Sequence, residues 1–375
     1  MEILAFFILV ICGMILHFFR INKIIVLPIF IIGLSTLIGL TYDVPDYGPY
    51  ESYFYLSQYI SFEDFDETTS QYYKVNNDIG YMFLNSLGYD SGLTYPEFRF
   101  VSTLLCIIIM AIVVYRLTDN IALVFVMYLI YPFIMDVCQV RNFIAEVLLL
   151  GSIYLLANRN SKRYLLFGVL VFLGATVHKS FILYLPFIFF LYARNHKKLS
   201  FIYKICLLIG LAMPLYEGVI IGRYEEMLIL MQSTTEEMNA SVRGYLSGET
   251  RYGFIVAYVK VMIMLLIIRY IRNNSYDIKS DLKRRYVEVI YLFLEYMCII
   301  MPVIGITATM WRYPRNLLLP LAICCAIYLE NKRRYRTCLT VLFCLCFWII
   351  SALEAGGDFS LLWNILQHNY FWWLF

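Results

Sequence analysis

Three arginines stand at turns or helix starts of an otherwise apolar chain, where they could bind an anion. Arg312 and Arg315 flank Pro314 within one turn, and arginine forms bidentate hydrogen bonds with phosphate oxygens. Arg141 opens a long apolar segment, a position in which a charged side chain costs free energy and therefore needs a reason. The three guanidinium groups together predict a site for a diphosphate.

A histidine and a lysine occupy the tight connection between two short apolar stretches. Histidine titrates near neutral pH, so His178 can act as a general base towards a hydroxyl group or bind a phosphate oxygen. Lys179 can bind an anionic group. Each residue also has a structural explanation, because His178 can hydrogen-bond the backbone at a helix end and Lys179 can reach the membrane interface. In the same way, Arg141 can pair with Asp136 in the turn before it.

Long apolar stretches separate these residues and set the class of fold. The chain has 375 residues, of which 61% are hydrophobic and 15% charged, whereas soluble domains have about 25% charged residues. A membrane-spanning helix needs roughly 20 apolar residues. We therefore predict an all-α polytopic integral membrane protein with about twelve transmembrane helices (range 10–13). The stretches are residues 3–19, 24–40, 100–115, 120–135, 143–157, 164–177, 181–193, 205–221, 253–269, 287–307, 316–329 and 337–353.

Basic residues are concentrated in every second connection between these stretches. The positive-inside bias places such connections in the cytoplasm, and this assignment puts both ends of the chain outside. The first stretch has no cleavage-site pattern and is expected to remain as a helix. A small set of basic residues then lies at the outer face against the bias, and this set supplies candidates for function: Arg141, Lys179, Arg243, Arg312 and Arg315.

A large acidic loop, residues 41–96, is expected at the outer face after the second helix. It contains nine acidic residues and one lysine, which gives a net charge of −8, and it also contains eleven tyrosines. Tyrosine is favoured at membrane interfaces, so the tyrosine-rich run 50–56 predicts a short interfacial helix. Helical spacing of residues predicts a second short helix at 79–87. A second outer loop, 222–252, carries Arg243.

One transmembrane helical domain is expected over residues 1–353, including both outer loops. Residues 354–375 form an aromatic tail, expected at the outer leaflet because aromatic residues favour the headgroup region. No nucleotide or metal motif is present in the sequence, so no cofactor and no metal site are expected. An enzyme that faces outward has no ATP available, and its substrate would arrive already activated and anchored in the membrane.

Short motifs made of these residues give the chain a resemblance to a known family. It resembles the EpsG-like branch of Wzy-type bacterial polysaccharide polymerases, over about residues 25–330. The chain departs from the family pattern at Asn142, where glutamine is expected, and at Asp78, where glutamate is usual. The matching residues are Asp46, Tyr50 and Tyr53; Asp78, Gly80 and Tyr81; Arg141, Ile144 and Ala145; His178 and Ser180; and Arg312 and Arg315.

The resemblance implies a metal-independent glycosyltransferase of GT-C-like architecture in the bacterial cytoplasmic membrane, with its active site facing outward. Such an enzyme transfers a growing glycan from undecaprenyl diphosphate to the next lipid-linked repeat unit. The implied partners are the lipid-linked donor and acceptor oligosaccharides and membrane lipids, with a flippase and a chain-length regulator as candidates. Nucleic acid is not an expected partner.

The candidate residues fit that reaction, because negative charge develops on the leaving diphosphate and fixed cations there stabilise the transition state. Arg141, Arg312 and Arg315 would take this role. His178 would be the general base to the acceptor hydroxyl or a further diphosphate ligand. The substrate-binding candidates, whose carboxylates would orient sugar hydroxyls and whose rings would stack on sugars, are Asp46, Tyr50, Asp78, Tyr81, Lys179 and Arg243.

Two other classes of function stay open from the sequence. A metal-dependent glycosyltransferase that uses polyprenyl-phosphate sugars would need an outer acidic pair, which Asp43 and Asp46 could supply. A flippase or transporter for lipid-linked oligosaccharides would often show repeated halves and polar groups near the membrane midplane. This chain has no detectable repeat, and its unusual charges are expected at the outer ends of helices.

Overall fold

Helices account for about 85% of the computed structural model, and no strand is present in the described part. The structure describes residues 2–57, 78–158, 162–195, 253–304, 312–330 and 334–354, together with 201, 204–206, 208–209 and 332. The second outer loop with Arg243, and residues 355–375 of the aromatic tail, lie outside the described residues.

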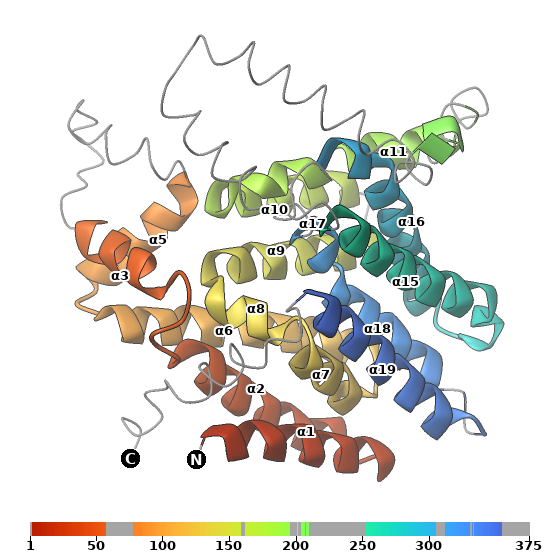
Figure 1. The fold of residues 1–375 in the computed structure, drawn as a ribbon, viewed down its shortest axis with the longest axis horizontal. Coiled ribbons are helices and arrows are strands. Elements are labelled where there is room, and N and C mark those ends of the chain that lie inside the picture. The colour runs from red at the N-terminus through yellow and green to blue at the C-terminus, as the bar shows by residue number, and fades with distance from the viewer. Residues whose placement is uncertain are drawn as a thin grey trace.

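The helices follow one another with short connections (Figure 1). The first half contains α1 (Glu2–Phe18), α2 (Lys23–Gly39), α3 (Tyr47–Leu56), α5 (Ile79–Asp90), α6 (Tyr95–Leu117), α7 (Ile121–Ile130), α8 (Phe133–Cys138) and α9 (Val140–Ala157). The second half contains α10 (Arg163–Val177), η2 (Lys179–Tyr184), α11 (Phe187–Asn195), α15 (Gly253–Asn273), η4 (Ser275–Asp277), α16 (Asp281–Ile304), α17 (Arg312–Arg315), α18 (Leu318–Leu329) and α19 (Arg336–Glu354).

Most of the expected apolar stretches coincide with these helices, apart from 205–221, which lies largely outside the described residues. Within the described residues, three helices are long and apolar enough to cross a membrane: α6, α9 and the 18 residues Arg336–Leu353 of α19. Other apolar helices are 10–17 residues long. The structure thus confirms an all-helical fold consistent with a membrane protein, while the twelve crossings and the GT-C-like architecture stay predictions. The short helices α3 and α5 also confirm the two that were expected in the first outer loop.

Two of the expected stretches are not single helices. Residues 120–135 form α7 and the short α8, with a break at Tyr131 and Pro132. Proline lacks a backbone N–H and disfavours helical geometry in the residue before it, which accounts for the break. Residues 181–193 form the 3₁₀ turn η2 followed by α11, which begins directly after Pro186.

The most apolar helices form the centre of the bundle. Every residue of α18 is buried, as is almost every residue of α7, and α9 packs against α6, α10 and α16. By contrast, α1, α2 and α19 expose large apolar side chains such as Ile11, Ile24 and Val341. Helices that are apolar all round belong inside a bundle, and helices with exposed apolar faces fit contact with lipid.

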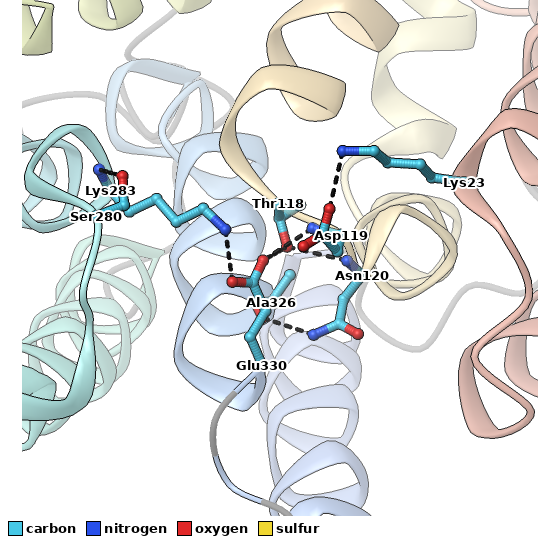
Figure 2. A network of polar contacts seen from close by, with 8 residues as sticks. All are labelled: Lys23, Thr118, Asp119, Asn120, Ser280, Lys283, Ala326 and Glu330. Carbon is cyan, nitrogen blue, oxygen red and sulfur yellow. Dashed lines mark hydrogen bonds and ion pairs between the residues drawn. The ribbon is translucent and has the colours of Figure 1, made fainter.

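The connections gather at two opposite ends of the molecule. In Figure 1, α3 and α5 lie at the left, while the α15–α16 and α18–α19 turns lie towards the right. We call the end that contains α3 and α5 the tyrosine end; it is formed by residues 43–50, 78–81, 139–142, 178–184 and 312–316. We call the second the basic end, formed by residues 20–23, 116–120, 283–285 and 330–336. Ion pairs join the separate turns of the basic end (Figure 2).

Candidate active site

A buried ion pair lies at the tyrosine end. Arg141 Nη1 is 2.6 Å from Asp78 Oδ2, and the two side chains are only 18% and 9% exposed. The other carboxylate oxygen of Asp78 accepts a hydrogen bond from the backbone N–H of Lys179, at 2.9 Å. One carboxylate therefore joins the start of α5, the start of α9 and the connection between α10 and η2.

The environment of Asp78 has opposing effects on its charge. Burial raises the pKa of Asp78 above its ordinary value, while the positive charge of Arg141 and the N–H of Lys179 lower it. The carboxylate of Asp78 therefore depends on Arg141 to compensate for its burial.

Asp136 is not the partner of Arg141, contrary to the structural alternative raised by the sequence. Asp136 is fully buried in α8 and accepts a hydrogen bond from the Tyr128 hydroxyl, at 3.0 Å. The reason is the break at Gln139, whose backbone is not helical (φ −116°, ψ +58°) and which separates α8 from α9. Asp136 and Arg141 therefore do not share a helix face, and Arg141 meets a carboxylate from a distant segment.

Two tyrosines complete the surroundings of the ion pair. The guanidinium of Arg141 lies over the ring of Tyr50, 5.4 Å from its centroid, which is an attractive cation–π geometry. The ring of Tyr81 lies 5.7 Å from that of Tyr50. Tyr81 and Tyr50 are only 3% and 6% exposed, so both rings are buried, and burial raises the pKa of the Tyr81 hydroxyl.

Gly80 allows α5 to approach α10 closely. A Cβ atom at Gly80 would lie 2.9 Å from the carbonyl carbon of Thr176 and would also overlap its Oγ1. This approach brings Asp78 to the N–H of Lys179. Steric contact with Thr176 therefore explains why the Asp78, Gly80, Tyr81 motif has a glycine at residue 80.

Gly80→Ala is expected to lower the free energy of unfolding by about 1–3 kcal/mol, because an added methyl in a filled space forces the two helices apart. The matched control is Gly48→Ala, since Gly48 has no atom within 4 Å of such a Cβ. That control is expected to leave stability unchanged or to raise it by up to about 1 kcal/mol, as alanine favours helix. Thermal unfolding in detergent measures the stability of both purified variants. Equal changes in stability for Gly80→Ala and Gly48→Ala would contradict the steric explanation.

His178 lies directly beside this cluster, between α10 and η2. Its ring Nδ1 is 2.7 Å from Ser180 Oγ, and the ring meets Phe181 edge to face. His178 is half-buried and the Lys179 side chain is exposed. The His178 and Ser180 motif thus fixes the orientation of an imidazole one residue away from the backbone contact to Asp78.

Arg315, at the end of α17, contacts the same helix start from a distant part of the chain. It is 2% exposed, and its Nη2 donates a hydrogen bond of 2.7 Å to Oε1 of Gln139, two residues before Arg141. Of Arg312, the structure describes only the backbone, as the first residue of α17. Asp46 is exposed, has left-handed backbone geometry (φ +67°) and begins α3. The structure thus gathers Asp78, Arg141, Tyr50, Tyr81 and the backbone of Lys179, with His178 and Arg315 alongside.

The family assignment agrees with this arrangement. The model of the EpsG family matches residues 24–363, which is most of the chain. The chain belongs to the EpsG family. This is a family of Wzy-like polysaccharide polymerases, so the resemblance stated from the motifs is confirmed and the chain has a role in polysaccharide polymerisation. No curated protein and no solved structure matches the chain.

The departure of this EpsG-family chain at Asn142 has a local explanation. The Asn142 side-chain amide donates a hydrogen bond of 3.1 Å to Oδ1 of Asn316, and Asn316 in turn donates to the Tyr184 hydroxyl at 3.1 Å. These buried contacts fix the turn after Arg315 against α9 and η2. Asn142 binds Asn316, the residue after Arg315, and this contact keeps Arg315 near the start of α9.

Sequence reasoning missed one buried arginine of this EpsG-family chain. Arg99 is 1% exposed, and its Nη2 donates to the carbonyl oxygens of Ile38, at 3.2 Å, and Val137, at 2.5 Å. These carbonyls lie at the C-terminal ends of α2 and α8, where positive charge is favourable. Arg99 lies between the acidic outer loop and the apolar stretch 100–115, and this position of a basic residue at the outer side was the signal that could have revealed it.

A buried carboxylate of α9, Glu146, lies close to Arg315. Glu146 is 1% exposed and interacts electrostatically with Arg315 and Asp136. These three residues belong to α9, α17 and α8, so spacing along the chain could not predict that they interact. Arg315 therefore has an acidic neighbour, Glu146, as well as the Gln139 side chain.

Proposed function

We propose that this protein polymerises polyprenyl-diphosphate-linked oligosaccharide repeat units at the outer face of the bacterial cytoplasmic membrane. The observation that carries the proposal is the cluster at the tyrosine end, where Arg141, His178 and Arg315 converge on the start of α9. This end lies opposite the basic end, which the positive-inside bias assigns to the cytoplasm. The site would then face the compartment in which lipid-linked repeat units are joined.

In the proposed reaction, a hydroxyl of the acceptor repeat unit attacks the anomeric carbon of the donor glycan. A glycosidic C–O bond forms, the bond between the anomeric carbon and the diphosphate oxygen breaks, and polyprenyl diphosphate leaves. His178 accepts the proton of the attacking hydroxyl. Arg141 and Arg315, with Arg312 as a further candidate, stabilise the negative charge on the leaving diphosphate.

The remaining residues would position these groups and the sugars. Asp78 holds Arg141 in place through the 2.6 Å ion pair, which makes Asp78 a positioning residue in this scheme. Tyr50 covers the guanidinium on one side. Asp46 and Lys179 are exposed and would contact sugar hydroxyls and anionic groups, and Arg243 stays a substrate-binding candidate from the sequence.

The experiment that tests the proposal is a profile of lipid-linked glycans in a deletion strain, with and without the wild-type gene. We expect the deletion to accumulate single complete repeat units at the outer face and to make no polymer. Complete units held on the cytoplasmic side would contradict the proposal and indicate a flippase. Truncated units, or loss of polymer on metal chelation, would contradict it in favour of a metal-dependent transferase.

A further inference from the structure

A polar pocket of about 390 Å³ lies at the basic end, far from the candidate active site along the helices. It is lined by the α1–α2 turn at residues 20–23 and by Asp119, Asn120, Glu330 and Arg336. The lining residues thus come from four separate parts of the chain. Neither the family assignment nor the proposed reaction gives this pocket a role.

The acidic groups of the pocket are already neutralised by lysines. Lys23 Nζ lies 2.8 Å from Asp119 Oδ1, and this contact holds the pKa of Asp119 below its ordinary value. Lys283 Nζ lies 2.6 Å from Glu330 Oε2. The other oxygen of Glu330 accepts hydrogen bonds of 2.8 Å from the Thr118 hydroxyl and from the backbone N–H of Asp119 (Figure 2). Neither carboxylate is therefore available to neutralise a further cation.

Two arginines of the pocket have no acidic partner in the described part of the chain. Arg336 is only 8% exposed, and its Nη2 donates to the carbonyl oxygen of His17 and to Oδ1 of Asn120, each at 2.9 Å. Both acceptors are neutral. The side chain of Arg20 is exposed and close enough to repel the positive charge of Arg336 electrostatically. Two neighbouring guanidinium groups without a counter-charge are unfavourable unless an anion lies between them.

The backbone adds to this positive potential. Three helices begin at the pocket, namely α2 at Lys23, α7 after Asn120 and α19 at Arg336. The N-terminus of a helix carries a partial positive charge and unpaired N–H groups, which favour anions. The helix starts and the two arginines therefore point to the same kind of ligand.

The rim of the pocket is apolar and accessible. Ile21 belongs to the lining, and the neighbouring Phe19 and Ile24 are 74% and 64% exposed. A second pocket at this end differs, because its arginines face acids: Arg272 pairs with Glu288, and Arg284 with Asp281. A cationic centre with an apolar rim fits an amphiphilic anion better than a soluble one.

We propose that the pocket bounded by Arg20 and Arg336 binds the phosphate of an anionic phospholipid headgroup, with the acyl chains against Phe19 and Ile24. In the orientation proposed above, this lipid belongs to the cytoplasmic leaflet. Binding would tie the α1–α2 turn to the starts of α7 and α19. The site is separate from the diphosphate site, and its test does not depend on polymerase activity.

The test is a titration of the purified full-length protein with dioleoylphosphatidylglycerol or dioleoylphosphatidylcholine in detergent, followed by native mass spectrometry. We expect one saturable site that prefers phosphatidylglycerol. Arg20→Gln is expected to weaken that binding about fivefold, because a basic residue near an anionic lipid contributes that much to affinity. The Arg20 side chain makes no hydrogen bond or ion pair with the described residues, so the variant should fold, which thermal unfolding verifies.

Arg116→Gln is the matched control, since Arg116 is exposed at the same end but does not line the pocket. It is expected to bind phosphatidylglycerol as the wild type does. Equal affinity of the wild type for both lipids, or equal weakening by the two substitutions, would overturn the proposal. Displacement of the lipid by millimolar inorganic phosphate would also overturn it, because the ligand would then be a soluble anion.

Discussion

Arg141→Ala is expected to lower polymer yield about 100-fold or more, which is the usual effect of removing one group that stabilises developing charge. Arg141 is the cation at the start of α9, paired with Asp78 and covered by Tyr50. Polymer yield from the deletion strain carrying the variant measures the effect, with the amount of membrane-inserted protein measured in parallel. Arg116→Ala, at the basic end, is the control and is expected to leave the yield unchanged.

Arg141→Ala is also expected to lower stability, and a second variant can separate this effect from the loss of catalytic function. Removing Arg141 leaves the buried carboxylate of Asp78 without its cation, which is expected to cost about 3–5 kcal/mol of stability. Adding Asp78→Asn removes that uncompensated charge, so the double variant should recover much of the stability. If Arg141 also acts on the substrate, polymer yield will stay low in the stable double variant. Recovery of polymer together with stability would show that Arg141 has only a structural role.

His178→Gln is expected to lower the rate of polymerisation about 100- to 10,000-fold, as the loss of a general base usually does. The glutamine keeps a polar side chain of similar size, so the connection between α10 and η2 should keep its shape. The measurement is the turnover rate of purified enzyme with lipid-linked repeat units across a range of pH. The wild type is expected to lose activity at low pH, where the imidazole is protonated, and the residual activity of the variant should lack that dependence.

Ser180→Ala tests the positioning of the same ring. It removes the hydroxyl 2.7 Å from Nδ1, and a single hydrogen bond of about 1 kcal/mol corresponds to a rate loss of about fivefold. This smaller loss, with the pH dependence kept but shifted, is the expected result for Ser180→Ala.

For the His178→Gln variant, an unchanged rate and an unchanged pH profile would show that His178 takes no part in the mechanism.

The helices of this protein follow from local patterns that the sequence shows directly. Apolar stretches of the right length predicted α6, α9 and α19, and helical spacing predicted the short α3 and α5. Pro132 and Pro186 account for the two apolar stretches, 120–135 and 181–193, that each form two shorter elements. The bias in basic residues singled out Arg141, Arg315 and Lys179, and the motifs indicated the family that the comparison then confirmed.

What the sequence could not determine is which of these residues meet. The sequence offered Arg141 an acidic partner five residues away. Its observed partner is Asp78, because non-helical Gln139 separates α8 from α9 and Gly80 lets α5 approach α10. The contact of Arg315 with Gln139, and the convergence of Arg20 and Arg336 on one pocket, likewise join distant segments. Helix formation depends on neighbours within a few residues, so the sequence by itself determined the helices. Side-chain pairing between helices depends on how they pack, and only the tertiary structure decided it.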